Sequence, residues 1–293
     1  MRYTLRQLEV FLAVARTGSV SRAGDELAMS QSAVSGSLAD LERQFDVRLF
    51  DRLGKRLHLS DVGRALRSRA EAIFDQAREL ESALAKQTDD ARLRVGATLT
   101  IGNYVVVPLM ARYMREGHGA MIRLDIANTE VITRRVANFE LDVGLIEGEL
   151  AHPELVITPF REDELVVFAA PTHPLAKKLT KTRRLTDADL ESADWIVREH
   201  GSGTRQAFDR AMSGILPELR IALELPHTEV IKRAVEAGLG VGCVSRLALT
   251  DAFKARTLKP CPVPHREFRR RFYTVLHRQK HVGAGLRRWL DLL

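Results

Sequence analysis

Cysteine is nearly absent from this sequence, and long hydrophobic runs are absent altogether. Cys243 and Cys261 are the only cysteines among 293 residues, and neither belongs to a CxxC pair. We therefore expect two buried thiols instead of a disulfide or a metal site. No apolar run approaches the roughly 18 residues of a membrane span, and the first residues, MRYTLRQLEVF, lack the features of a signal peptide. These absences predict a cytoplasmic protein without a metal ion or a cofactor.

Catalytic motifs are missing as well. The nine histidines show no HxxxH or HExxH spacing, and there is no GxSxG elbow, Walker motif or paired-carboxylate arrangement. The glycine-rich segment at residues 238–242 follows a predicted helix and precedes a predicted strand, which is the reverse of a dinucleotide site. We predict that the chain is not an enzyme.

The net charge of +7 does not by itself indicate DNA binding, because of where the charge lies. Residues 1–90 hold 14 Lys or Arg and 14 Asp or Glu, so this segment is neutral. Residues 266–293 hold eight Lys or Arg and two Asp or Glu, which accounts for most of the excess. Any interaction with DNA must therefore depend on the local placement of a few cations.

Three short helices are predicted before residue 45. Apolar residues at helical spacing predict a first helix that ends at Gly18. Ser19 or Ser21 can cap a short second helix, and Ser30 can cap a third helix that runs to about Gln44. Small residues in the second helix allow two helices to cross closely, as a helix-turn-helix requires.

A short wing is predicted after these helices. Its apolar residues alternate with polar ones and are Phe45, Val47, Leu49, Phe50, Leu57 and Leu59. We place the turn between the two strands at residues 53–55. Residues 1–60 are thus predicted to form a winged helix-turn-helix domain.

The third helix has the surface that a major groove admits. One face is apolar, and the other carries short polar side chains that can approach base edges. Cations in the wing can neutralise phosphates and fix the register without reading sequence. The predicted DNA contacts are Arg22, Gln31, Ser32, Ser35, Arg52, Lys55 and Arg56.

A long helix is predicted from Ser60 to about Gln87. Its apolar residues are spaced alternately by four and three: Leu66, Ala70, Ile73, Ala77, Leu80 and Leu84. Such a heptad seam favours pairing with a second copy of the chain, although the helix could instead lie on its own domain. Thr88-Asp89-Asp90 breaks the pattern, so residues 61–90 are predicted to be a linker and dimerisation helix.

Short apolar strands alternate with helices after residue 91, which predicts buried parallel sheets. The predicted strands are residues 93–98, 122–128, 141–148, 155–160, 164–171, 195–199, 221–226, 241–245 and 272–277. The chain is expected to leave one lobe (residues 91–163 and 266–293) for a second lobe (residues 164–265). The predicted fold class is therefore α+β multidomain, with a two-lobed α/β domain at residues 91–293.

Four predicted helix starts could form a ligand pocket between the lobes, because unpaired N–H groups converge there. They are residues 98–103, 128–129, 201–205 and 227–229, and they carry hydroxyl groups. A small polar pocket suited to an anion is predicted, although each Ser or Thr could simply be a helix cap. Glu147 should lie at the same level, where its carboxylate must be protonated or paired, for instance with Arg198 or Arg205.

The whole chain resembles the LysR-type transcriptional regulators. The residues LRQLEVFLAVARTGSVSRAGDELAMSQSAVSGSLADLERQFDVRLFDR at 5–52 are similar to the DNA-binding signature of that family. The resemblance implies a winged helix-turn-helix, a linker helix that dimerises, and an effector domain like a periplasmic binding protein. It also implies a homodimer or homotetramer on promoter DNA, with a small effector between the lobes and a potential contact to RNA polymerase.

TLTIGNY (98–104), DVGLIEGE (142–149), EDELVVFAAPTHPL (162–175), REHGSGTRQAFD (198–209) and HRQKH (277–281) look like the YeiE-type branch of that family. That branch is associated with sulfite sensing, which implies a small anionic effector. The matched effector positions are Thr98, Thr100, Asn103, Thr129, Glu147, Ser202, Gly203, Thr204 and Arg205. An organic acid or an amino acid remains the alternative effector, and a ligand-binding protein that acts without DNA remains the alternative function.

Gly36 departs from the family pattern, since many members have an arginine or another large polar residue there. A glycine inside a helix costs roughly 0.5–1 kcal/mol relative to alanine and removes a side chain that could reach a base. The sequence therefore predicts greater reliance on Gln31 and on the wing.

This division of roles predicts different outcomes for two substitutions. Gln31→Ala should relax sequence preference, because a base contact is lost. Lys55→Ala should weaken binding to all sequences alike and reduce the salt slope by about 1, because a phosphate contact is lost. Binding isotherms on the chain's own upstream DNA and on random DNA at several salt concentrations measure both effects. Equal losses on both DNAs for both variants would contradict the assignment.

Overall fold

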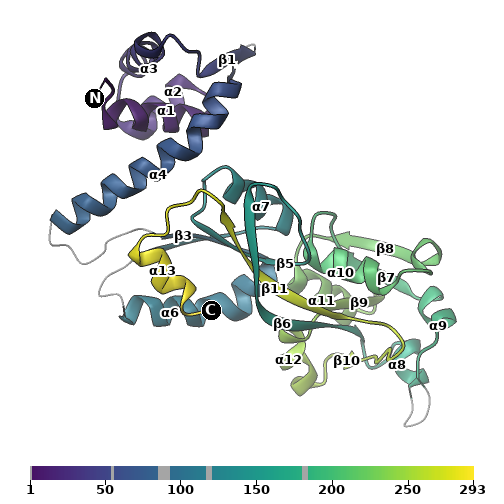
Figure 1. Cartoon of the computed structure of the whole chain (residues 1–293). Helices are drawn as coiled ribbons and strands as arrows, with labels where there is room; N and C mark the ends of the chain where they lie inside the picture. The colour runs from purple at the N-terminus through teal and green to yellow at the C-terminus, as the bar shows by residue number, and fades with distance from the viewer. Residues whose placement is uncertain (1, 54–55, 85–92, 117–120, 180–183) are drawn as a thin grey trace.

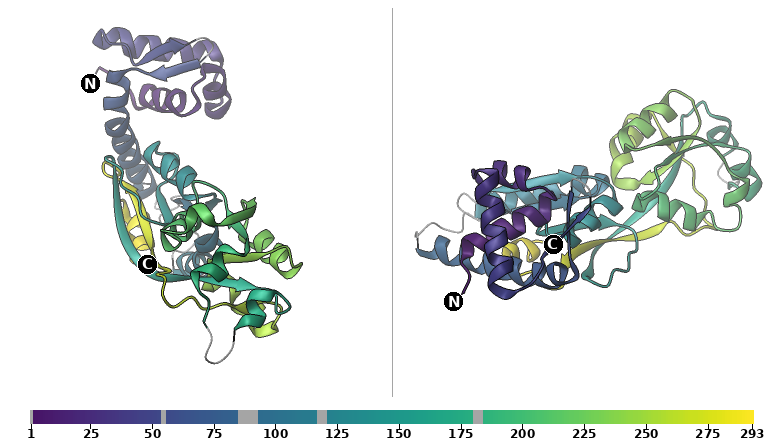
Figure 2. Two further views of the ribbon diagram at one scale, coloured as in Figure 1. Left: turned by 90° about the vertical axis from the view of Figure 1, so that its right-hand side faces the viewer. Right: turned by 90° about the horizontal axis from the view of Figure 1, so that it is seen from above.

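The computed structural model describes residues 2–53, 56–84, 93–116, 121–179 and 184–293 (Figure 1). A helical N-terminal domain continues into one long helix, and a two-lobed α/β region follows. In both views of Figure 2 lobe II lies farther from the N-terminal domain than lobe I does. This arrangement confirms the predicted fold class. No helix among the described residues is long and apolar enough to cross a membrane.

The N-terminal helices begin and end at residues that suit those positions. They are α1 (Leu5–Thr17), α2 (Val20–Leu27) and α3 (Gln31–Phe45). Thr4, Ser19 and Ser30 cap their first turns with side-chain oxygens, so Ser19 and not Ser21 is the cap of α2. Gly18 ends α1 in the left-handed conformation.

The helix-turn-helix depends on a close approach at Gly24. A Cβ atom at this position would lie 2.7 Å from the backbone oxygen of Met29, so only glycine fits without a shift of the backbone. The helices enclose one apolar core that includes Val10, Phe11, Val14, Ala23, Val34, Leu38 and Leu41.

The wing is shorter than expected. Its strands are β1 (Phe50–Leu53) and β2 (Arg56–Leu59), which pair antiparallel. The prediction that the wing begins at Phe45 was wrong, because α3 continues through Phe45 and Asp46 then takes a left-handed cap. The Glu42 carboxylate accepts hydrogen bonds from the backbone N–H groups of Leu49 and Phe50. These bonds fix the segment between α3 and β1 to the helix. The predicted wing tip, with Lys55, lies outside the described residues.

Helix α4 (Asp61–Leu84) is the predicted linker helix. At 1.5 Å per residue it extends over roughly 36 Å. Leu66, Ile73 and Leu80 are spaced by seven residues and are 38%, 39% and 61% exposed, whereas Ala70 is buried in the core of the N-terminal domain. Part of the heptad seam therefore faces outward along one line. The predicted end of the helix and its break at residues 88–90 lie outside the described residues.

One mixed sheet joins the two lobes. Its strand order is β4-β3-β5-β11-β6-β9-β7-β8, and β10 also pairs with β6. The strands are β3 (Leu93–Ala97), β4 (Ile122–Ile126), β5 (Val143–Glu147), β6 (Leu155–Ala169), β7 (Asp194–Arg198), β8 (Arg220–Leu225), β9 (Val241–Ser245), β10 (Lys259–Pro260) and β11 (Arg269–His277). The outer strands of each lobe run parallel, as predicted. The two central strands, β6 and β11, pair antiparallel with their neighbours.

Strand β6 corrects the prediction of two strands at residues 155–160 and 164–171. It is one strand of 15 residues that passes from lobe I into lobe II (Figure 1). Charged residues occupy its middle, between the two predicted strands. They continue the strand because Glu162, Asp163 and Glu164 lie opposite Arg271, Arg270 and Arg269 of β11, and opposite charges stabilise cross-strand pairs.

Helices cover both faces of the sheet in each lobe. Lobe I has α5 (Leu99–Ile101), a π-helical turn η1 (Gly102–Val106), α6 (Val107–Glu116), α7 (Thr129–Ala137) and α13 (Ala284–Leu290). Lobe II has α8 (Pro174–Lys178), α9 (Asp187–Glu191), α10 (Gly203–Ala211), the 3₁₀ turn η2 (Leu216–Glu218), α11 (Thr228–Glu236) and α12 (Arg246–Ala255). Helix α12 was not predicted from the sequence.

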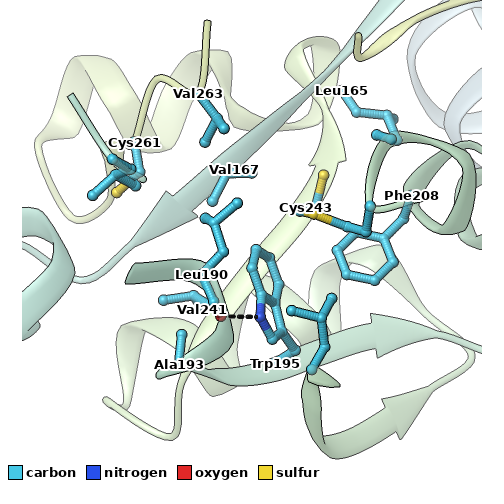
Figure 3. Packing of buried hydrophobic residues seen from close by; sticks show 14 of the residues in the cluster. Leu165, Val167, Leu190, Ala193, Trp195, Phe208, Val241, Cys243, Cys261 and Val263 are labelled. Carbon is cyan, nitrogen blue, oxygen red and sulfur yellow. Dashed lines mark hydrogen bonds between the residues drawn. The ribbon is translucent and has the colours of Figure 1, made fainter. Parts of the chain in front are cut away.

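The core of lobe II contains both cysteines (Figure 3). Trp195 is fully buried there, and its indole N–H donates to the backbone oxygen of Leu190 at 2.9 Å. Cys243 and Cys261 are free and buried, which confirms the expectation of two buried thiols. Burial raises the pKa of both thiols, that of Cys261 to about 11, so neither is a reactive thiolate.

Two glycines of the N-terminal domain should respond oppositely to alanine. Gly24→Ala should destabilise the domain by about 1–3 kcal/mol, the usual cost of overpacking, because the added methyl group meets a backbone oxygen. Gly36→Ala, the matched control, should stabilise it by about 0.5–1 kcal/mol, because no atom lies within 4 Å of its added Cβ. Thermal unfolding of the full chain measures both changes, and a stability loss of the same size in both variants would contradict the steric explanation.

Candidate ligand site and DNA-binding surface

The exposed face of α3 carries the residues predicted to contact bases. Gln31, Ser32 and Ser35 are exposed, whereas Val34 and Leu38 on the opposite face are buried. The hydroxyl of Ser32 also lies 3.0 Å from the hydroxyl of the capping Ser30. The face is therefore flat and short-chained, as the prediction requires.

Exposed arginines flank this helix. Arg52 and Arg56 lie on the two paired strands of the wing, and both are exposed. Arg22 is exposed on α2 and donates to the backbone oxygen of Thr17. These positions suit phosphate contacts, while Lys55 lies outside the described residues.

A buried carboxylate, that of Glu147, is the centre of the predicted ligand site. Glu147 ends β5 and is 1% exposed. Its Oε1 accepts from the Thr98 hydroxyl at 3.0 Å and from the Thr100 backbone N–H at 2.9 Å. Its Oε2 accepts from the Thr204 hydroxyl at 2.8 Å. The structure thus brings residues of two of the predicted segments, 98–103 and 201–205, together around one acid.

The partner of Glu147 is Arg270 of β11, which sequence reasoning missed. Nη1 of Arg270 lies 2.8 Å from Oε2 of Glu147, and its Nε lies 2.7 Å from Asp163. The predicted partners were wrong, because Arg198 pairs with Glu199 and Arg205 pairs with two other acids, Asp209 and Glu224.

A signal for Arg270 was present in the sequence. It is the middle residue of three consecutive arginines in a strand, and successive side chains of a strand point to opposite faces. Arg269 and Arg271 are exposed, so the middle side chain points inward.

Glu147 is ionised in this environment. Burial alone would raise the pKa of its carboxyl group. Arg270 and the hydrogen bonds from Thr204 and Thr100 outweigh burial and lower the pKa to about 2. The site therefore already contains one negative charge, held by donors that an external anion would otherwise use.

Hydrogen bonds close the two lobes on each other around Glu147. Besides the Thr204 contact, the Gly203 N–H donates to the Thr129 hydroxyl at 3.2 Å, and this hydroxyl donates to the Glu147 backbone oxygen at 2.8 Å. Farther out, the Tyr104 hydroxyl donates to Glu229 at 2.6 Å. Gly203 fits only because it lacks a side chain, since a Cβ atom there would lie 1.8 Å from the backbone oxygen of Glu147.

Two buried donors beside Glu147 have no partner. They are the Thr100 hydroxyl and Nη2 of Arg270. Both residues contact the Glu147 carboxylate through another atom, so the unpaired groups belong to the same cluster. Buried polar groups are rarely left unpaired, so these two donors are candidates to bind a ligand.

An open cleft of about 770 Å³ adjoins this cluster. The predicted residues Thr129, Ser202, Gly203 and Arg205 line it. Asn103, in contrast, is exposed on η1 and makes none of the contacts described above. Apart from Asn103, the predicted site residues thus lie in the buried cluster or on the wall of the cleft.

The alternative role as helix caps holds for some of these residues and not for others. The Ser202 hydroxyl accepts from the Thr204 N–H at 3.2 Å and caps α10. Thr98 stands at the cap position of α5 but makes no capping hydrogen bond. Its hydroxyl donates to the Glu147 carboxylate instead. No group of three or more His, Cys, Asp or Glu residues in the described part of the chain could hold a metal ion.

Known proteins similar to this chain cover its whole length. Residues 5–64 match the bacterial regulatory helix-turn-helix protein, lysR family, and residues 86–293 match the LysR substrate binding domain. The chain is 44% identical over 291 residues to the uncharacterized HTH-type transcriptional regulator YeiE of Escherichia coli (strain K12), and the match covers 99% of this chain and 97% of that protein.

Solved structures show the same fold. Full-length OxyR from Pseudomonas aeruginosa matches with a TM-score of 0.73 at 18% identity, over 100% of this chain and 93% of that chain. The regulatory domain of CcmR from Synechocystis PCC6803 in complex with 2-PG matches with a TM-score of 0.62 at 28% identity. That match covers 68% of this chain and 94% of the other.

The ionised state of Glu147 predicts a pH dependence of stability. Its folded pKa of about 2 lies below its ordinary value of 4.5. Its stabilising effect is therefore complete above about pH 4.5 and is lost as the pH falls towards 2. Wild type should exceed Glu147→Gln in stability by on the order of 3 kcal/mol at pH 7, and the difference should shrink in acid.

Chemical denaturation at several pH values measures this difference. Glu149→Gln is the matched control, because Glu149 is an exposed acid two residues away with a side chain that is 69% exposed. A difference between wild type and Glu147→Gln that stays constant from pH 7 to pH 2 would contradict the ion pair.

Proposed function

Because the chain belongs to the LysR family of DNA-binding transcriptional regulators with a ligand-binding domain, we propose that its effector is a small oxyanion of the sulfite class. We place the effector between the lobes, against the cluster around Glu147. The relatives are named transcriptional regulators, and the function proposed is regulatory and not enzymatic.

The two unpaired buried donors carry this proposal. The Thr100 hydroxyl and Nη2 of Arg270 are free to donate to oxygen atoms of a ligand. Hydrogen bonds to a charged acceptor contribute about 1.5–3 kcal/mol each, so a small anion gains affinity from both. The N-terminal end of the continuous helical segment that α5, η1 and α6 form adds a partial positive charge to this attraction.

The charge of Glu147 limits which oxyanion fits. A doubly charged anion would lie against an ionised carboxylate, and burying like charges together is costly. Hydrogen sulfite has one negative charge and one proton. Its oxygen atoms can accept from Thr100 and Arg270 while its proton is donated to Glu147. Affinity for sulfite should therefore fall as rising pH removes that proton.

A second effector class is favoured by a different observation. The open cleft beside the cluster is larger than an inorganic anion needs, and it is lined by Thr129, Ser202 and Arg205. An amino acid or an organic acid could fill it, with an ammonium group paired to Glu147. Competition between sulfite and such compounds distinguishes the two classes.

Two exposed apolar surfaces support a homotetramer. Leu66, Ile73 and Leu80 form a line along α4 that a second α4 helix can cover. Exposed apolar residues also lie on the edge strands of both lobes, with Ile126 on β4 and both Ile221 and Leu223 on β8. Such edges are usually covered by another element, and we propose pairing of effector lobes there.

In this proposal, residues 1–60 read promoter DNA, residues 61–90 pair two chains, and residues 91–293 bind the effector in the cytoplasm. Ligand binding shifts the population of lobe orientations. This shift changes how two DNA-binding domains lie on their half-sites, and with them the bend of the DNA and the contact to RNA polymerase.

Titration calorimetry of the full chain with sulfite, sulfate, amino acids and organic acids tests the proposal. Sulfite should bind, and Ser202→Ala and Thr129→Ala should abolish the ligand response while DNA binding persists. Ser213→Ala, an exposed serine of lobe II, is the matched control. Wild-type sulfite affinity in both site variants would contradict the pocket, and binding of amino acids but not sulfite would favour the second class.

A further inference from the structure

Helix α4 is joined to lobe I by buried charges and not only by the chain connection. Lys280, which follows β11, places its Nζ 2.5 Å from Asp75 of α4 and 3.0 Å from Asp142 of lobe I. Its side chain is only 7% exposed. A buried ammonium group must be paired to be tolerated, so Lys280 holds the helix and the lobe together.

Arg94 completes this arrangement on the lobe side. Its guanidinium lies 2.8 Å from Asp142, and its backbone N–H donates to the same carboxylate at 2.7 Å. Burial would raise the pKa of Asp142, but Lys280 and Arg94 outweigh it and lower the pKa to about 2. Asp142 is therefore a fixed negative charge between two cations.

A second contact lies roughly two helical turns closer to the N-terminus of α4 than Asp75 does. Arg67 donates to the backbone oxygen of Asn138, the residue that ends α7. The next residue, Phe139, is buried with φ of 54°, a conformation that bulky side chains rarely adopt. Its ring packs on His277 with the ring centroids 4.0 Å apart, which helps to hold this conformation.

These contacts lie at the opposite end of the elements that form the ligand site. Asp142 directly precedes β5, which ends at Glu147, and Arg94 lies in β3, which Thr98 directly follows. Thr129 begins α7, which Asn138 caps, and Arg270 lies in β11, which ends three residues before Lys280. Each of these four elements therefore links a residue of the ligand site to the group of residues that holds α4.

The ligand site and the contact with α4 are separated by short, rigid elements. A strand of five residues spans roughly 16 Å, and nine helical residues span roughly 14 Å. The strands are also paired to one another in register. A displacement at the ligand site therefore moves the contact with α4 as part of the same packed layer.

We infer that Lys280, Asp75 and Arg67 form the joint through which lobe I positions the linker helix, and that movement of β5, β11 and α7 on ligand binding is transmitted to the DNA-binding domain there. The effector in this statement rests on the proposed function, whereas the joint itself does not. These three are positioning residues, because none of them touches the ligand site.

Asp75→Asn and Arg67→Gln test the joint, each made in the full chain. Both residues are half-buried on α4, and Glu81→Gln, an exposed acid of the same helix, is the matched control. Sulfite affinity measured without DNA should be unchanged in all three. The effect of sulfite on DNA affinity, which couplings of this kind place at about 5–150-fold, should fall towards one in the two joint variants and persist in the control.

A second readout needs no ligand. Spin labels at Gln44→Cys in α3 and Arg115→Cys in α6 report the distance between the DNA-binding domain and lobe I. Both positions are exposed, and the two native thiols are buried. Labelled chains diluted with unlabelled protein should give a narrow distance distribution, which Asp75→Asn and Arg67→Gln should broaden.

The two readouts separate the two proposals. If sulfite fails to bind the wild-type chain, the proposed effector is wrong, and the label distances still decide the joint. Distributions that are as narrow in both joint variants as in Glu81→Gln would overturn the joint, as would an unchanged sulfite effect on DNA affinity.

Discussion

The buried ion pair between Glu147 and Arg270 is the interaction on which the two-lobed region depends. Removing Arg270 would leave Glu147 buried without its cation, and removing Glu147 would leave Arg270 paired with Asp163 alone. Breaking a buried pair typically costs several kcal/mol. Donors from both lobes, including the Thr98 and Thr204 hydroxyls, converge on this one carboxylate. The closed arrangement of the lobes is thus built around an anion that belongs to the protein. Under the proposed function, the effector would bind beside that charge, so its own charge and proton would decide which oxyanion is selected.

Placement of this ion pair also explains the layout of lobe I. Glu147 and Arg270 lie on neighbouring antiparallel strands, β5 and β11. At its other end each strand leads to a residue of the contact with α4, Asp142 before β5 and Lys280 after β11. The ligand site and the linker helix therefore meet opposite edges of one thin layer. In a layer packed as tightly as a protein interior, such edges do not move independently.

Local patterns predicted much of this fold. Hydroxyl caps at Ser19 and Ser30 and alternating apolar strands depend on neighbouring residues, and the structure confirms both. The predictions that were wrong concern features that depend on contacts between distant segments. The prediction of two strands in place of β6 was wrong. The charged residues between them are paired by a strand more than a hundred residues later in the chain, and local patterns cannot reveal such a partner. Arg270 was missed for the same reason: the fold, and not the spacing along the chain, brings it to Glu147. Phe45 was assigned to the wing from the alternation of apolar and polar residues, but it is the last residue of α3.

The two free, buried cysteines have a consequence for chemistry in solution. Sulfite is a nucleophile that cleaves disulfide bonds and leaves an S-sulfonate on one sulfur atom. A chain whose only cysteines, Cys243 and Cys261, are unpaired and inside a hydrophobic core offers no such bond to attack. With the proposed sulfite effector, binding would therefore remain reversible, because the protein offers no disulfide bond for sulfite to cleave.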